Sequence, residues 1–407
     1  MNATPGFVKD ARQMRGSNHS GMRQFNERIV LQAIRHHHAI AKADLARVTQ
    51  LSTQTISVIV NRLLEDGLLV KQDRVRGRIG QPSVPLSLDP DGVFSLGLQV
   101  GRRSLEVVVC DFVGHIRHSL QFHYPYPDPD VVLANIRTAL SDMQSALGAY
   151  WSRTVGIGLT APLSMHEWAH LMGGDAAPAL QRWADIDLPA AVRELTDLPV
   201  VFAKDTLAAC VAELVQGHGR AVGSYLYVFV GTFIGGALVL GGHIMSGTRN
   251  NAGALGSIPT GIARAGDDPM QLLQLASGWQ LEQALLAAGH DPKTVQREEI
   301  MEPCFRDLTE RWLSSASEAL AMCITSASAL LDMDAVVIDG TLGGPLMAEL
   351  IQRTRDNLSH YPGQGLHTPV ILPGRVGAHA RAVGGALLPL HTQFFPDKDI
   401  FLKQDLA

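Results

Sequence analysis

One short segment of the chain has the spacing of a zinc-protease motif. The run His166–His170 reads His-Glu-Trp-Ala-His, in which two histidines one helical turn apart would bind zinc and Glu167 would act as the base. Glu194 is a distant candidate for a third ligand. Pro162 precedes the run and Gly173–Gly174 follow it, so any helix is short, and sixteen histidines in the chain make a chance match easy. We therefore expect no metal site, and a metal-dependent hydrolase stays only as an alternative.

A second set of reactive groups lies at the ends of apolar runs. Lys204 and Asp205 directly follow the strand-like run Val200–Ala203, and the glycine-rich turn Gly231–Gly236 follows another. Glycine lets a phosphate approach the backbone. A glycine-rich turn can also simply join two strands. Lys204 would favour an anionic ligand, unless it only pairs with Asp205.

The cysteines and the N-terminus bear on the cellular compartment. The four cysteines, at positions 110, 210, 304 and 323, are far apart and form no Cys-x-x-Cys pair. This pattern excludes a disulfide-stabilised scaffold and a thiolate zinc site, and it is typical of a reducing compartment. The first residues of the chain are polar and lack the apolar stretch of a signal peptide. We expect a cytoplasmic protein without a cofactor.

The uncharged stretch Ala221–Gly242 is long enough to cross a bilayer. It contains six glycines, and short apolar runs separated by glycines are typical of two buried strands joined by a turn. Glycine disfavours the interior of a helix. We therefore predict strands here and no membrane as a partner.

Charge is distributed unequally along the chain. Residues 1–90 contain 13 Lys and Arg against 7 Asp and Glu, a net charge of +6 (13 − 7), whereas the remainder contains 21 against 32, a net of −11 (21 − 32). DNA phosphates attract such a basic head and repel the acidic body. The composition, 46% apolar and 18% charged, is that of folded domains with large cores.

The basic head has the pattern of a winged helix-turn-helix. Helical periodicity predicts helices over Asn26–His37, over Lys42–Thr49 and from the N-cap Ser52 to Gly67. A strand from Leu68 and a basic, glycine-containing loop predict the wing. In such a module the third helix enters the major groove of DNA, and an arginine-bearing wing can reach the minor groove.

Polar residues off the apolar stripe of the third helix are the candidate DNA contacts. Glutamine can bond adenine with two hydrogen bonds, and arginine can bond guanine or a phosphate. An ordinary solvated basic face is the alternative interpretation. The predicted contacts are Thr53, Gln54, Thr55, Ser57, Asn61 and Arg62 on the helix, with Arg76 and Arg78 on the wing.

Beyond residue 93 the pattern changes to strands and helices in alternation. Further strands are predicted at 155–159, 200–203 and 335–339, and helices at 130–149, 206–216, through much of 270–331, and at 377–388. A weak internal repeat appears when SLGLQVGRRSLEVVVCDFVGHI is laid beside YLYVFVGTFIGGALVLGGHI. The repeat comprises strands predicted at Phe94–Val100, Leu105–Asp111 and His115–His123, and again at Tyr225–Val230, Ala237–Leu240 and His243–Ser246.

The head and the body together resemble one family. The run LARVTQLSTQTISVIVNRLLEDGLLV, followed by Gly80-Gln81-Pro82, closely resembles the DNA-binding head of ROK-family repressors, and the resemblance continues over roughly residues 26–390. It implies an α/β fold with an α-rich head: an N-terminal winged helix-turn-helix followed by a bilobal actin-like, RNase H-like ROK domain. This is the sugar-kinase architecture, usually dimeric or tetrameric, and it requires a duplicated three-strand pattern.

The first strand turns depart from what the resemblance implies for the family's kinases. Where those kinases begin with a DxGGTK-like turn, the chain has Gln99-Val100-Gly101-Arg102-Arg103-Ser104, so Gln99 replaces the aspartate that helps organise Mg-ATP. Two arginines stand where glycine normally lets phosphate approach. In the second phosphate turn, Phe233 replaces a usual glycine.

The sugar-binding motifs implied by the resemblance are altered as well. The family's Glu-x-Gly-His motif, which contacts sugar and zinc, reads Ala254–Ser257, and residues 258–276 contain no cysteine or histidine for the zinc loop. A later sugar-contacting glutamate is replaced by Leu273, or is Glu282 if the alignment slips. The family's Asn-Asp pair reads Lys204-Asp205, so only the base is kept.

These departures predict a body that senses a ligand without phosphorylating it. We expect a DNA-binding transcriptional regulator, a repressor of carbohydrate-related genes that binds double-stranded operator DNA as a homodimer or homotetramer and takes a sugar or sugar phosphate as effector. A divergent ROK sugar kinase and a DNA-binding protein controlled only by protein partners are alternatives. The candidate effector-binding residues are Thr160, Lys204, Asp205, Asn251 and Ala254.

The predicted organisation has five parts. A flexible arm is expected over 1–22, the winged head over 23–82 and a linker over 83–92. The effector-sensing and oligomerisation domain, with two lobes, is expected over 93–390, and a tail over 391–407.

Overall fold

The computed structural model describes residues 19–73, 84–169, 174, 176–262, 270–361 and 363–396. These residues belong to two compact units. The first, called the head, ends at Leu88 and includes Phe394–Pro396, and the second, called the body, runs from Asp89 to Gln393.

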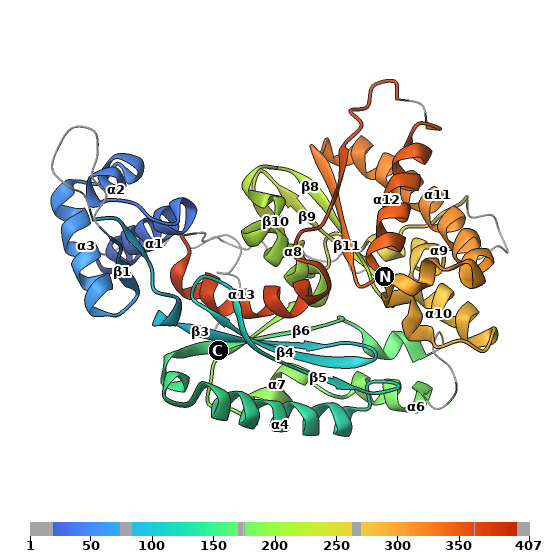
Figure 1. Cartoon of the computed structure of the whole chain (residues 1–407), viewed down its shortest axis with the longest axis horizontal. Helices are drawn as coiled ribbons and strands as arrows, with labels where there is room; N and C mark the ends of the chain where they lie inside the picture. Colours follow the sequence, from blue (N-terminus) through green and yellow to red (C-terminus); the bar gives the residue numbers. More distant parts are fainter. Residues whose placement is uncertain are drawn as a thin grey trace, which may run out of the picture. The chain divides into compact units, whose positions relative to one another are not determined.

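The head is a three-helix module with a two-stranded ribbon, drawn in blue in Figure 1. The third helix begins after an N-cap in which the Ser52 hydroxyl accepts a hydrogen bond from the Thr55 amide at 3.1 Å. Gly67 ends it with a positive φ of 69°, as predicted. The elements are α1 (His19–His37), α2 (Lys42–Thr49), α3 (Thr53–Glu65), β1 (Leu69–Lys71) and β2 (Leu86–Leu88).

The ends of the head differ from the prediction at two places. Helix α1 begins at His19, inside the segment expected to be an arm, and an Arg23–Glu27 ion pair at i, i+4 lies in its N-terminal half. Strand β2 lies inside the expected linker and pairs antiparallel with β1. Leu86 and Leu88 point inward and Ser87 does not, an alternation that the three surrounding prolines obscured.

The body contains two five-stranded sheets with the same topology. Their strand orders are β5-β4-β3-β6-β7 and β10-β9-β8-β11-β12, each an antiparallel three-strand meander extended by two parallel strands. The internal repeat is therefore confirmed. The strands are β3 (Phe94–Val100), β4 (Ser104–Asp111), β5 (Ile116–His123), β6 (Thr154–Ala161), β7 (Val200–Lys204), β8 (Tyr225–Val230), β9 (Ile234–Leu240), β10 (His243–Met245), β11 (Ala335–Gly340) and β12 (Val370–Pro373).

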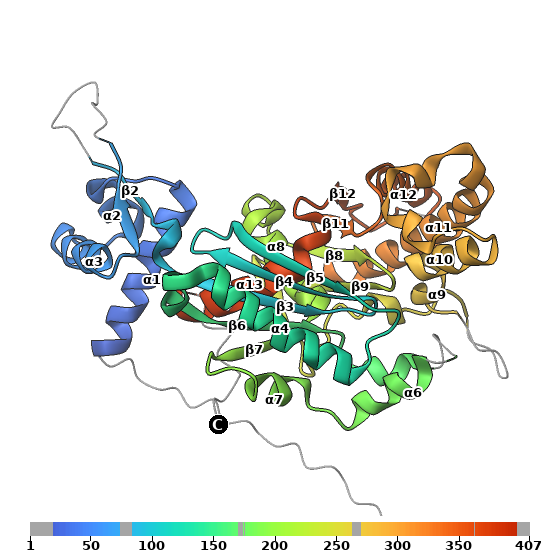
Figure 2. The same ribbon diagram turned by 60° about the horizontal axis from the view of Figure 1, so that its bottom comes forward.

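Each sheet has a core of its own. One core joins the first sheet to α4 and α7, and the other joins the second sheet to α9 through α12 (Figures 1 and 2). Helix α12 and strand β12 were not predicted, and α13 runs past the expected end of the domain. The helices are α4 (Pro129–Leu147), α6 (Ala176–Gln181), α7 (Leu188–Arg193), α8 (Asp205–Gln216), α9 (Leu272–Ala276), α10 (Gly278–Ala287), α11 (Arg306–Leu331), α12 (Gly344–Leu358) and α13 (Ala380–Phe394).

Helix α13 lies directly on the face of the first sheet opposite α4. A Cβ added to Gly97 on β3 would collide with the backbone of Ala382, and one added to Gly158 on β6 would collide with that of Gly385. Only glycine permits this approach, since any side chain would push the helix off the sheet. On its other side, α13 meets α8, where Gly384 touches the backbone of Ala208.

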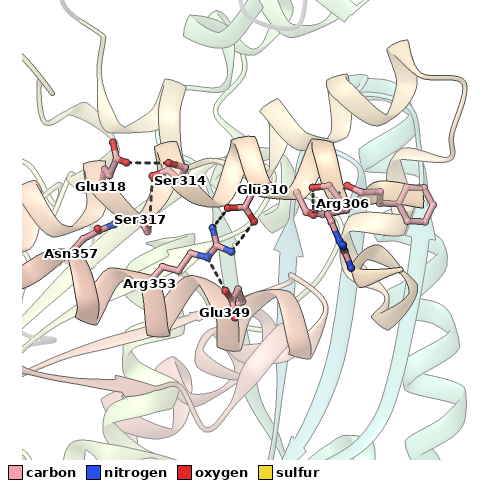
Figure 3. A network of polar contacts seen from close by, with 10 residues as sticks. Arg306, Glu310, Ser314, Ser317, Glu318, Glu349, Arg353 and Asn357 are labelled. Atoms are coloured by element: carbon pink, nitrogen blue, oxygen red, sulfur yellow. Dashed lines mark hydrogen bonds and ion pairs between the residues drawn. The ribbon is translucent and has the colours of Figure 1, made fainter. Parts of the chain in front are cut away.

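A network of charged side chains joins α11 to α12 (Figure 3). Arg353 donates to both carboxylate oxygens of Glu310, at 2.6 and 2.8 Å, and its Nε donates to Glu349 at 2.7 Å. One helical turn further along, Asn357 donates to Ser317 at 2.9 Å. The two helices are thus held in register by polar contacts at their outer edge.

The uncharged stretch 221–242 forms β8 and β9, as predicted. In the described ranges no helix combines the length and the apolar character that crossing a membrane requires.

Candidate functional site

Helix α3 presents a polar face to solvent. Its buried side consists of Ile56, Ile59, Val60 and Leu63, which fix the helix against the rest of the head. Among the predicted DNA contacts, Thr53, Gln54, Asn61 and Arg62 are exposed, whereas Thr55 and Ser57 are half-buried. Thr55 is also engaged at the helix start, where its hydroxyl lies 2.8 Å from that of Ser52.

Two of these side chains are held by partners from the other helices. The Lys42 ammonium group on α2 donates to the side-chain oxygen of Asn61 at 2.9 Å. Arg62 donates to Glu27 on α1 at 2.9 Å and lies 3.6 Å from Asp66. Sequence reasoning missed the roles of Lys42 and Glu27, because residues 19 and 35 positions away along the chain give no local signal.

A groove runs between α1 and α3 beside this face. It is lined by Met22, Arg23, Asn26, Glu27, Gln54, Thr55, Val58, Ile59 and Arg62. The predicted wing contacts Arg76 and Arg78, and the Gly80-Gln81-Pro82 segment, lie outside the described residues.

In the body, the equivalent turns of the two sheets meet. The turn after β3 carries Arg102, whose guanidinium carbon lies 4.0 Å from the centre of the Phe233 ring on the turn after β8. Arg103 lies 3.4 Å from the Glu282 carboxylate and stacks on Trp279 at 5.3 Å. We call the set Arg102, Arg103, Thr232, Phe233, Trp279 and Glu282 the cross-lobe cluster.

The charges of this cluster are largely removed from water. Arg102 is 9% exposed and Glu282 is 3% exposed. Burial lowers the pKa of Arg102 to about 9, and the nearby carboxylates of Asp205 and Glu282 oppose the shift. Burial also raises the pKa of Glu282, against the opposite effects of Arg103 and of a hydrogen bond from Thr232 at 3.2 Å. The cluster brings two arginine side chains to the corner where the resemblance places Mg-ATP in kinases.

Gln99 lies fully buried at the end of β3. In the sheet it pairs with Glu106 on β4 and with Thr160 on β6. Its side-chain oxygen and nitrogen have no hydrogen-bond partner among the described residues. Burial of an amide whose oxygen and nitrogen both lack hydrogen-bond partners costs free energy of folding. This position is therefore a candidate for a ligand contact.

Two predicted effector residues, Lys204 and Asp205, lie at the carboxyl end of β7, and the first of them contacts a third, Asn251. Lys204 donates to the side-chain oxygen of Asn251 at 2.9 Å, and burial lowers its pKa. Asp205 accepts from the Thr206 amide at 2.8 Å and lies 3.9 Å from Arg381 on α13. Each of these two side chains therefore contacts a residue other than its sequence neighbour, so a simple Lys204–Asp205 pair does not account for their contacts.

The two remaining effector candidates lie on separate elements. Thr160 is buried on β6, where its hydroxyl donates to the Leu98 carbonyl at 3.4 Å. Ala254 is half-buried and precedes the short 3₁₀ turn Leu255–Ser257.

The zinc-protease spacing does not fall on an α-helix. Met165–Trp168 form a 3₁₀ helix, in which side chains four residues apart do not share a face. His170 lies outside the described residues, and Glu194 is the C-cap of α7. In the part of the chain that the structure describes, no three His, Cys, Asp or Glu side chains are grouped so as to hold a metal ion.

Comparison with family models decides the classification. A model described as the ROK family matches residues 95–392. The chain belongs to the ROK family. A second model, described as the MarR family, matches residues 24–79, the part that contains the head helices.

Individual relatives of this ROK chain are distant. The uncharacterized protein y4fQ of Sinorhizobium fredii is 27% identical over 371 residues, which is 91% of this chain and 92% of that protein. The xylose repressor of Bacillus subtilis is 24% identical over 241 residues, 58% of this chain and 60% of the repressor.

Solved structures of regulators and of kinases share the ROK fold with this chain. A ROK family transcriptional regulator, a homolog of the E. coli MLC protein, has a TM-score of 0.63 at 22% identity and covers 92% of this chain and 98% of its own. A ROK family glucokinase from Streptomyces griseus in complex with glucose and AMPPNP has a TM-score of 0.57 at 19% identity, covering 72% of this chain and 98% of its own. The predicted ROK architecture is confirmed, and function depends on the residues of the sites.

Proposed function

We propose that this ROK chain is a transcriptional repressor of carbohydrate-related genes. Its head binds double-stranded operator DNA, and its body binds a sugar or sugar phosphate without phosphorylating it. Two observations in contrast carry the proposal. Helix α3 has an exposed polar face, whereas the strand turns that would hold phosphate in a kinase are filled by the arginines and aromatic rings of the cross-lobe cluster.

The head supports the DNA-binding half of the proposal. The third helix of a helix-turn-helix enters the major groove, where Gln54 and Asn61 are of the types that bond adenine and Arg62 is of the type that bonds guanine or phosphate. The head's net positive charge provides the non-specific attraction to the duplex. Thr53, Thr55, Ser57, Arg76 and Arg78 complete the proposed contact set.

The body supports binding without phosphoryl transfer. A phosphate needs backbone N–H groups and Mg²⁺ at the two strand turns, and here Arg102 packs on Phe233 instead. Asp205, the retained base of the family, lies 3.9 Å from Arg381 and accepts a hydrogen bond from the Thr206 amide in the first turn of α8. The proposed effector contacts are Thr160, Lys204, Asp205, Asn251 and Ala254, and the unmatched amide of Gln99 would bond a ligand hydroxyl.

Control of DNA binding follows from two copies acting together. A homodimer or homotetramer would place two heads on a pseudo-palindromic operator, since protein symmetry and half-site spacing match in this class. An effector that binds one arrangement of the lobes more tightly shifts the population toward it and thereby changes operator affinity.

The test is operator selection followed by effector titration. Duplexes of random sequence are enriched on the full-length protein, the recovered site is footprinted, and its affinity is measured by fluorescence anisotropy with and without a panel of sugars and sugar phosphates. Gln54→Ala should weaken binding, whereas Gln32→Ala, which changes an exposed glutamine on α1, should not. A protein that enriches no sequence would refute the proposal, and so would one whose operator affinity no sugar changes.

A divergent sugar kinase is the second candidate, because solved sugar kinases share the fold and Asp205 is kept. Sugar-stimulated ATP turnover by the purified chain, lost in Asp205→Asn, would favour it over the repressor.

A further inference from the structure

An apolar side chain interrupts the polar face of α3. Val58 is 62% exposed, and it lies one helical turn after Gln54 and one turn before Arg62. The apolar residues that hold the helix point to the opposite side, so Val58 adds nothing to the core. A β-branched residue also lowers helix propensity, so its presence at a solvated position is not explained by the stability of the head.

The neighbours of Val58 hold its surroundings in a defined geometry. The rim of the adjacent groove is fixed by Glu27, which accepts from both Arg23, at 3.3 Å, and Arg62, at 2.9 Å. On the same exposed face, Lys42 holds Asn61. Along α3 the methyl groups of Val58 lie between the Gln54 carboxamide and the Arg62 guanidinium group. Both of these groups are suited to hydrogen bonds with base edges.

We propose that Val58 contacts the C5-methyl group of a thymine and thereby specifies one T·A pair in each operator half-site. The inference rests on the proposed function, in which α3 occupies the major groove. Among the four bases, only thymine offers an apolar group there, and valine can make no hydrogen bond to any other base edge. In this proposal, contacts of Gln54 and Arg62 with the DNA fix the position of α3 in the major groove. At that position Val58 favours a base that carries a methyl group.

The experiment removes one methyl group from the DNA at a time. Each thymine of the selected site is replaced in turn by deoxyuridine, which keeps every hydrogen-bonding group, and the affinity is measured for the wild-type chain and for Val58→Ala. For the wild type, replacement at one position of each half-site should weaken binding about fourfold, the equivalent of ~0.8 kcal/mol for one buried methyl group. In Val58→Ala the same replacement should have little effect, whereas the other positions should respond as in the wild type.

A matched control lies on the neighbouring helix. Val48 on α2 is 45% exposed, and Val48→Ala should keep the wild-type response to deoxyuridine at every position. Retention of the full methyl dependence in Val58→Ala would overturn the proposal, as would a wild-type profile with no sensitive thymine.

The groove that Val58 lines between α1 and α3 has a second conceivable occupant, another copy of the chain. If Val58→Ala lowers the oligomer mass measured by sedimentation without DNA, and leaves the deoxyuridine profile unchanged, the surface is an interface between copies and the proposal is wrong. If the wild type binds no duplex at all, the repressor function itself fails. Sequence-specific binding without a methyl-sensitive position would contradict the Val58–thymine contact and leave the repressor function in place.

Discussion

Helix α3 of the head and the cross-lobe cluster of the body use polar and charged side chains in opposite ways. On α3, Gln54 and Arg62 are exposed and contribute little to the core. In the body, Arg102 and Glu282 are buried and interact with other side chains of the chain. Exposed polar groups are available to a partner, whereas buried ones maintain the fold. The comparison predicts that substitutions in the head change binding and that substitutions in the cluster change stability.

The largest effect is expected for Arg102→Ala. The change removes a buried cation and the side chain packed on Phe233, and it leaves the carboxylates of Asp205 and Glu282 with less compensating charge. Large-to-small substitutions at buried positions cost about 2–5 kcal/mol of unfolding free energy, because the lost contacts leave a cavity. The midpoint of urea unfolding should therefore fall strongly.

The control for this variant is an exposed arginine of the same body. Arg182 is 46% exposed and pairs with Asp128 and Asp130, so Arg182→Ala should leave the unfolding midpoint nearly unchanged. Equal unfolding midpoints for the two variants would show that the buried cluster does not contribute to the free energy of unfolding. The difference proposed between head and body would then be wrong.

The next largest effect is expected for Asn61→Ala, measured on DNA. Removal of a side chain that bonds a base edge costs about 1–3 kcal/mol of binding free energy. Because Asn61 is exposed, the thermal midpoint of the protein should stay within about 1 °C of the wild type. A large loss of stability with no change in operator affinity would reverse the roles assigned to the two regions.

The fold could be predicted from the sequence wherever one period of apolar residues persisted. The helix Lys42–Thr49, the strand Phe94–Val100 and the repeated meander all follow from local patterns that burial then reinforces. Strand β2 could not be distinguished from a linker, because three residues flanked by prolines give little signal. The helix start at His19 could not be predicted, because the residues His19, Ser20 and Gly21 have neither apolar spacing nor high helix propensity.

The sites were less accessible to sequence reasoning. Comparison with family motifs showed which catalytic residues had been replaced, but the contact of Arg102 with Phe233 joins positions 131 residues apart (233 − 102). The partners of Asn61 and Arg62 lie on other helices. Val58 was not among the predicted contacts because only polar residues off the apolar stripe were considered, and its exposure is visible only in the folded head.

A smaller effect is expected at the outer edge of the second lobe. Arg353 is 28% exposed and joins α11 to α12 through Glu310 and Glu349 (Figure 3), an arrangement between a buried and a surface ion pair. Arg353→Met keeps most of the aliphatic stem and should lower the thermal midpoint by about 2 °C or less. A loss of stability as large as that of Arg102→Ala would mean that the degree of burial does not determine how much these side chains stabilise the fold.

The smallest effect is expected for a pair whose charge depends on pH. His379 lies before α13 and forms a short hydrogen bond with the buried Glu106 on β4, which raises the pKa of His379 above its usual 6.5. A raised pKa in the folded state means that the protonated form favours folding: the stabilisation is fully present below pH 6.5 and is lost as the pH rises through the folded-state value. His379→Gln keeps a neutral hydrogen-bonding group, so the wild type should be slightly more stable than this variant at pH 5.5, and the two should converge once the pH exceeds the folded-state pKa of His379. Thermal unfolding across that range measures the difference, with His118→Gln, an exposed histidine on β5, as the matched control. Because 59% of the His379 side chain is exposed, solvent weakens the pair, and a difference that is constant with pH would show that only packing connects α13 to the first sheet here.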